Sequence, residues 1–175
     1  MAKNRVVLRG SERPPIPNAE NPRQADRHER FTVSVVLRRR SELTPPAGDF
    51  LSREHLVTVH GATASDLSVV RDFAREFGLQ VLAESSAKRT IQLAGTVEAM
   101  EAAFGVLLET VEVNGKTHRQ RVGPIHLPED VAPVVRAVLG LDNRQQADTR
   151  SRFAATGSFR PFAAGGGALS PLDVA

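Results

Sequence analysis

Apolar and polar residues alternate over residues 31–37, just before the run of three arginines at 38–40. An alternation with a period of two is typical of a β-strand with one buried face, because successive side chains of a strand point to opposite sides. The apolar residues that would share the buried side are Phe31, Val33, Val35 and Leu37. We therefore predict a half-buried strand here.

The spacing of apolar residues becomes helical after Thr63, where they recur every three or four positions as far as the Phe-Gly pair at 77–78. The hydroxyl of Thr63 can cap the first turn of a helix. Glycine commonly ends a helix, because it adopts the left-handed backbone conformation at little cost. A second helix is predicted from Thr96 to the Phe-Gly pair at 104–105, and a shorter one over residues 52–60.

Strand-like runs follow both Phe-Gly pairs. We predict strands over residues 79–84 and 89–94 after the first pair, and over 106–113 after the second. Asn114–Gly115 is a strong two-residue hairpin signal, so residues 116–122 should return as an added strand. The order strand, helix, strand, strand, helix, strand predicts an α+β domain with the ferredoxin-like split β-α-β arrangement, in which helices cover one face of an antiparallel sheet.

A C-terminal helix is predicted after Pro128, where proline is favourable in a first helical turn. Its end is placed at Gly140. The apolar residues that suggest the helix are Val131, Val134, Val135, Val138 and Leu139.

Both ends of the chain are predicted to lie outside this domain, which we place at residues 29–142. Residues 1–28 contain four prolines, which lack the N–H needed for regular structure, so we expect an extended N-terminal arm. Residues 143–169 combine small residues with scattered arginine and phenylalanine, and we expect a flexible linker or tail.

Composition excludes several classes of protein. Apolar residues make up 41% and charged residues 25% of the chain, which is ordinary for a globular domain. Cysteine is absent, which excludes disulfides, thiolate catalysis and cysteine-ligated zinc. No apolar run approaches the roughly 20 residues of a membrane span, and the N-terminal residues contain no apolar stretch of signal-peptide length. We expect no membrane partner.

No catalytic residue, metal ligand or cofactor-binding residue is predicted. The chain contains no GxSxG elbow, Walker loop or HExxH motif. The acidic pairs occur at predicted helix starts, where the helix dipole explains them. The five histidines are scattered and are interpreted as ordinary surface or core residues: His28, His55, His60, His118 and His126.

Positive charge gathers outside the predicted core. Residues 51–142 carry nine Lys or Arg against twelve Asp or Glu, so the excess of basic residues lies in the flanking segments. In the tail, basic and aromatic residues suited to the cleft of a protein partner are Arg150, Arg152, Phe153, Phe159, Arg160 and Phe162. The same residues could instead stack on bases and pair with phosphates, or form an inert linker.

Several segments, taken in order, resemble the activation domain of pro-kumamolisin, from the sedolisin family of serine-carboxyl peptidases. They are HGAT at 60–63 continuing to FGL at 77–79, LAGT at 93–96 continuing to AFGV at 103–106, and 127–142 from LP to GLD. Residues 7–15 resemble the opening of such propeptides, with Arg9 where we expect proline. Residues 170–175, SPLDVA, resemble the first residues of the peptidase domain.

The resemblance implies a non-catalytic pro-region that folds by itself, docks its sheet on a peptidase domain, and acts as folding template and inhibitor. It implies a partner joined in the same polypeptide, secretion with that partner, and activation in acid. The catalytic residues and a calcium site belong to the peptidase domain, so we expect no cofactor in this chain. A cut is expected in the small residues Ala163, Ala164, Gly165, Gly166, Gly167 and Ala168.

Two other functions stay open from the residues alone. The first is a stand-alone ferredoxin-like module that binds nucleic acid through its basic arms, which would show a steep loss of affinity with salt. The second is a regulatory domain for a small ligand, for which the sequence offers no pocket signature.

Overall fold

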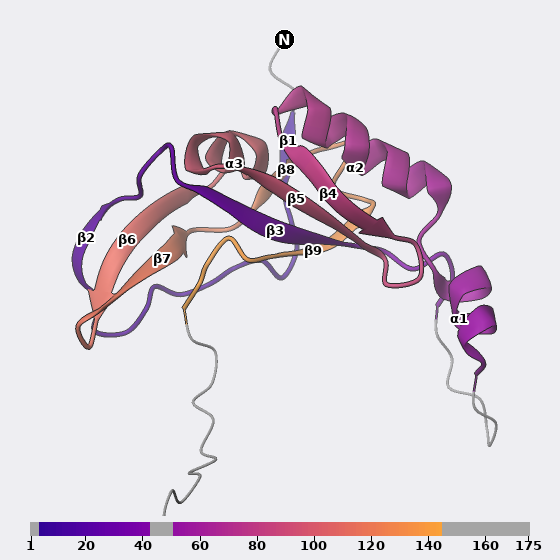
Figure 1. The fold of residues 1–175 in the computed structure, drawn as a ribbon, viewed down its shortest axis with the longest axis horizontal. Helices are drawn as coiled ribbons and strands as arrows, with labels where there is room; N and C mark the ends of the chain where they lie inside the picture. The colour runs from indigo at the N-terminus through magenta and orange to yellow at the C-terminus, as the bar shows by residue number, and fades with distance from the viewer. Residues whose placement is uncertain (1–3, 43–50, 145–175) are drawn as a thin grey trace, which may run out of the picture. The chain divides into compact units, whose positions relative to one another are not determined.

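A computed structural model describes residues 4–42 and 51–144 (Figure 1). The tail and cut residues predicted from the sequence, Arg150 to Ala168, and the peptidase-like end at 170–175 lie outside the described residues. Within the described part, helices and antiparallel sheets combine in an α+β fold, as predicted.

A four-stranded sheet forms the centre of the domain, with the strand order β4-β5-β3-β9. Its strands are β3 (Arg30–Leu37), β4 (Gln80–Ser85), β5 (Thr90–Thr96) and β9 (Val135–Leu139), and all neighbours are antiparallel. In the simplest ferredoxin-like order, the strand after the second helix would border β3. Here β9 takes that place.

Three helices are present in the described residues: α1 (Arg53–His60), α2 (Ala64–Glu76) and α3 (Val97–Phe104). The predicted caps are confirmed, because the hydroxyls of Thr63 and Thr96 accept hydrogen bonds from the backbone N–H groups of Asp66 and Ala99. Helices α2 and α3 cover the same face of the four-stranded sheet (Figure 1). Gly105 ends α3 in the left-handed conformation, with φ of 58°.

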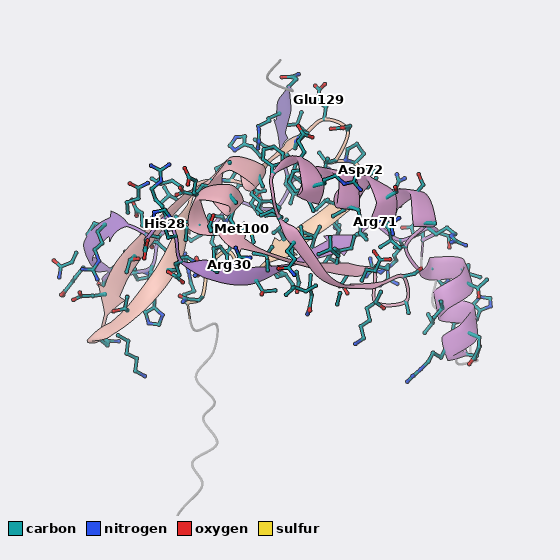
Figure 2. All side chains as sticks on the ribbon, turned by 45° about the horizontal axis from the view of Figure 1, so that its top comes forward. His28, Arg30, Arg71, Asp72, Met100 and Glu129 are labelled. Carbon is teal, nitrogen blue, oxygen red and sulfur yellow. The ribbon has the colours of Figure 1, made fainter. Side chains whose placement is uncertain are left out.

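The core lies between these two helices and the sheet. Phe73 of α2 packs against Phe104 of α3 with ring centroids 5.6 Å apart, and Phe104 is fully buried. Met100, labelled in Figure 2, is also fully buried and approaches Gly95 of β5. The predicted alternation of β3 is confirmed, since Val33, Val35 and Leu37 are buried beneath the helices.

Two smaller sheets complete the domain. Strand β6 (Leu107–Val113) pairs with β7 (Lys116–Val122) across the predicted hairpin, whose turn residues Asn114 and Gly115 have positive φ. Strand β2 (Glu20–Gln24) pairs with the other side of β6. Strand β1 (Arg5–Val7) pairs with β8 (His126–Pro128).

The predicted C-terminal helix is wrong. After β8, residues 129–134 form turns in which the N–H groups of Val131 and Ala132 donate to the carbonyl of Pro128, and residues 135–139 then form β9. Pro133 lacks an N–H and so cannot continue a helix. The valines that suggested a helical stripe are β-branched, which also suits a strand, and pairing with β3 decided between the two states.

The absence of regular structure predicted for the N-terminal segment is also wrong, because β1 and β2 lie within it. Pro22 falls in β2, which borders its sheet and changes register between Glu20 and Arg23. Edge positions and irregular register are where strands tolerate proline. Leu8 and Ala25 belong to the buried core, so this segment is packed onto the domain.

Among the described residues, none of the helices has the length and apolar character that crossing a membrane requires.

Candidate docking face and tail anchor

The face of the four-stranded sheet opposite α2 and α3 carries one charged side chain in its paired positions, Arg30, which opposes Thr96 at one end of the sheet. Directly opposed residues of antiparallel strands point to the same side, and the pairs Ser34 with Gln92 and Ser34 with Leu139 fix which side this is. Beyond the Arg30–Thr96 pair, the rest of this side forms a surface that we call the uncharged face. By the same register its members are Thr32, Ser34, Val36, Gln80, Ala83, Ser85, Thr90, Gln92, Ala94, Ala137 and Leu139.

This uncharged face is accessible, since none of its members is buried and Leu139 is 57% exposed. One quarter of the chain is charged, so a surface of eleven exposed or half-exposed positions without a charge is clearly depleted of charged side chains. Charged residues are also depleted at the centres of protein interfaces, because a charge that loses water without a partner is costly. The face has the chemistry of a docking surface.

Arg119 of β7 anchors the chain just before the predicted tail. Its side chain is only 8% exposed and donates to the backbone carbonyls of Gly140 and Leu141, with nitrogen–oxygen distances of 3.3 and 3.2 Å. It also pairs with Glu29 at 2.7 Å and lies over the ring of Phe31 at 3.6 Å. These contacts hold the residues after β9 against β7.

Asn143 and Arg144 extend this anchor, although the tail was predicted to begin at 143. The backbone N–H of Asn143 donates to the carbonyl of Arg119, and the backbone N–H of Arg119 donates to the side-chain Oδ1 of Asn143. Arg144 donates through Nε to both carboxylate oxygens of Asp142, at 2.9 and 2.8 Å, and Arg13 contributes a further ion pair at 3.5 Å. The C-terminal part of the described chain is therefore fixed by charged hydrogen bonds.

The pKa of the Asp142 carboxyl group depends on its two basic partners, Arg144 and Arg13. Burial alone would raise the pKa of Asp142, but hydrogen bonds from Arg144 and the charges of Arg144 and Arg13 outweigh it and hold the pKa below its ordinary value. A carboxyl with a lowered folded pKa stabilises the fold above its unfolded pKa, near 3.9, and loses that contribution as the pH falls through the folded value.

Asp142→Asn is expected to lower the free energy of unfolding at pH 7 by about 1–3 kcal/mol, the usual worth of hydrogen bonds to charged groups. Its unfolding midpoint should also change less than that of the unsubstituted chain when the pH is lowered below 4, because the titrating group is gone. Urea unfolding at several pH values measures both effects. The exposed Asp72 of α2 supplies the control, since Asp72→Asn should cost less than about 0.5 kcal/mol at pH 7. Equal acid dependence with and without Asp142 would contradict the assignment.

The histidines are placed in different parts of the domain, and within residues 4–42 and 51–144 no group of three or more His, Asp or Glu is arranged to hold a metal ion. His60 is buried at the end of α1, with Nδ1 3.0 Å from the hydroxyl of Ser41. The Ser41 hydroxyl donates to the carbonyl of Val59, so the Nδ1 of His60 is the donor in this contact.

Sequence reasoning missed the anchor altogether. Arg119 belongs to a basic, polar strand whose sequence predicts exposed side chains. The spacing of residues along that strand does not indicate that Arg119 contacts Gly140 and Leu141. The uncharged face did have a signal, since β3 and β5 contain no charged residue between Phe31 and Leu37 or between Thr90 and Thr96.

Comparison with known proteins places this chain in a family. Residues 34–144 match the family described as Pro-kumamolisin, activation domain. Kumamolisin from Bacillus sp. (strain MN-32) is 35% identical over a region that covers 99% of this chain and 34% of that protein. Sedolisin from Pseudomonas sp. (strain 101) is 26% identical over 67% of this chain and 20% of that protein. The chain thus spans about a third or less of the length of these relatives, and it belongs to the pro-kumamolisin activation domain family.

Proposed function

We propose that this domain is the non-catalytic pro-region of a sedolisin-type serine-carboxyl peptidase, and that it docks on the peptidase through the uncharged face of β4-β5-β3-β9. The observation that carries the proposal is that face, which is accessible and, apart from Arg30 at the end of the same side, free of charge. Family membership and the share of kumamolisin that the chain spans support a partner domain in the same polypeptide.

A docked domain would act first as a folding template. A preformed sheet presents a fixed surface, so little conformational entropy is lost on its side when the peptidase folds against it. The domain is built to offer such a surface by itself, because Phe73, Met100 and Phe104 provide its own buried core.

The same docking would place the segment after Arg144 at the peptidase cleft and inhibit it. Residues 143–169 carry the arginines suited to an acidic cleft and the phenylalanines suited to apolar subsites. We expect the cut to fall within 163–168, no cofactor in this domain, and secretion together with the peptidase.

Acid would release the inhibitor if carboxylates of the peptidase pair with arginines of the tail. Such a pair lowers the pKa of the carboxyl group. The pairing is therefore intact above the pKa of a free carboxyl group, near 4, and is lost as the pH falls through the lowered pKa of the paired group.

Titration of mature kumamolisin with the 175-residue chain tests both parts of the proposal. Hydrolysis of a peptide substrate should be inhibited near neutral pH, and the inhibition should weaken as the pH approaches 3. Inhibition that stays constant down to pH 3 would reject acid release, and the absence of inhibition at every pH would reject the inhibitory role itself.

Nucleic-acid binding by stacking finds no support in the described part of the chain. Its four phenylalanines are packed: Phe73 and Phe104 are buried, and Phe31 and Phe77 are half-buried against the core. Bases are held mainly by exposed aromatic rings in this class of domain.

A further inference from the structure

A groove lined with arginine runs beside β9, at the border of the four-stranded sheet. Three adjoining recesses of about 150, 350 and 470 Å³ share Arg136 as a lining residue. Residues 8–13 of the N-terminal segment line the smallest, and Arg38 to Glu42 with Arg89 line the largest. The groove adjoins the uncharged face, since Ala137 and Leu139 also line the smallest recess. Arg136 itself falls at the register shift between β3 and β9, outside the regular alternation of that face.

Three arginines of this groove have no partner among the described residues. No hydrogen bond or ion pair within residues 4–42 and 51–144 is assigned to Arg9, Arg39 or Arg136. The other arginines of the largest recess are already held. Arg38 pairs with Asp66 at 2.9 Å, Arg40 donates to the carbonyl of Thr58 at 2.9 Å, and Arg89 donates to that of Leu37 at 2.7 Å.

The positive charge of the groove is not compensated locally. Its lining carboxylates are Glu12 and Glu42, one at each end. The pKa of Arg89 is lowered by burial and by the nearby charge of Arg39. Like charges held together in this way favour an anion that can lie between them.

We propose that Arg9, Arg39 and Arg136 form a binding groove for an acidic peptide segment, one that carries several carboxylates in an extended stretch. Guanidinium groups match carboxylates in a planar, two-point geometry, and the three arginines line recesses that share Arg136. The inference goes beyond the proposed function, since it concerns a ligand of the isolated chain and three arginines that are not members of the docking face.

A peptide suits the groove better than a nucleic acid does. No aromatic residue lines any of the three recesses, so bases have nothing on which to stack. The described residues carry nineteen Lys or Arg against seventeen Asp or Glu, a net charge of +2, so little attraction extends beyond the groove to a long polyphosphate.

The test uses the full 175-residue chain and a fluorescein-labelled peptide of eight glutamates, followed by fluorescence anisotropy at pH 7 and low salt. Arg39→Gln together with Arg136→Gln should weaken binding roughly tenfold or more, since both variants remove charges without a structural partner. The matched control is Arg23→Gln with Arg30→Gln, which removes the same charge from β2 and from the start of β3, where Figure 2 labels Arg30. That control should bind within about twofold of the unsubstituted chain.

A gain of affinity provides a second readout. Glu12→Gln with Glu42→Gln should strengthen binding of the same peptide, because it removes the carboxylates that border the groove. Unchanged thermal unfolding of each variant confirms that the fold is intact.

Three results would overturn the proposal. They are no binding of the peptide at low salt, equal weakening by the two pairs of arginine substitutions, and tighter binding of a single-stranded oligothymidylate of the same charge. None of them bears on inhibition of a peptidase, so this inference and the proposed function fail independently.

Discussion

Placing a charge of either sign at Gln92 is expected to weaken inhibition of mature kumamolisin by about 100-fold. Gln92 is exposed in the middle of β5 and faces the same side as Ser34 of β3, at the centre of the uncharged face. Docking would bury the new charge without a partner, and an uncompensated buried charge costs about 3–5 kcal/mol, of which 2.7 kcal/mol corresponds to 100-fold.

Testing both Gln92→Arg and Gln92→Glu distinguishes two explanations. A face that excludes all charge should disfavour both variants, whereas an attraction or repulsion by the peptidase should affect arginine and glutamate in opposite ways. If the face is excluded from water on docking, both variants should weaken inhibition. The control is Thr117→Arg, which places the same charge on an exposed residue of β7 in the three-stranded sheet. Opposite effects of arginine and glutamate at position 92, or equal weakening by Thr117→Arg, would show that the face does not dock as proposed.

Phe104→Ala is expected to lower the free energy of unfolding by about 3–5 kcal/mol. Phe104 is fully buried at the end of α3 and packs against Phe73 of α2, so its removal leaves a cavity where the two helices meet the sheet. A small domain has a total stability of about 5–15 kcal/mol, so the variant should be close to unfolding.

Urea unfolding measured by circular dichroism gives the size of this effect. Leu82→Ala on the edge strand β4 serves as the control, because Leu82 is 50% exposed and its truncation should cost less than about 1 kcal/mol. A loss below about 1 kcal/mol for Phe104→Ala would mean that the packing of α2 and α3 does not stabilise the domain.

Local signals in the sequence predicted those parts of the fold that depend on neighbouring residues. The caps at Thr63 and Thr96, the hairpin at Asn114–Gly115 and the alternation of β3 each follow from spacing over a few positions. These features are as predicted because the physical cause lies within the segment itself.

Pairing between distant segments could not be predicted in this way. Residues 135–139 have apolar positions that suit either a helix or a strand, and only the free edge of β3 makes the strand favourable. In the same way, β1 and β2 are strands because β8 and β6 offer them partners, although their prolines argue against regular structure.

The candidate site also has parts that local sequence predicts and parts that depend on contacts between distant segments. The lack of charge between Phe31 and Leu37 and between Thr90 and Thr96 is visible in the sequence, whereas the side of the sheet on which these residues lie follows from the register of four strands. Arg119 and the groove at Arg136 depend on contacts between residues far apart in the chain, and periodicity carries no information about them.

Methyl NMR of the labelled 175-residue chain, with and without mature kumamolisin at neutral pH, tests the central claim most directly. The methyl groups of Val36, Ala94, Ala137 and Leu139 lie on the uncharged face, and those of Leu107 and Val122 are exposed on β6 and β7. We predict that the first group shifts or broadens on addition of the peptidase while the second stays unchanged. Shifts confined to Leu107 and Val122, with none on the uncharged face, would contradict the account.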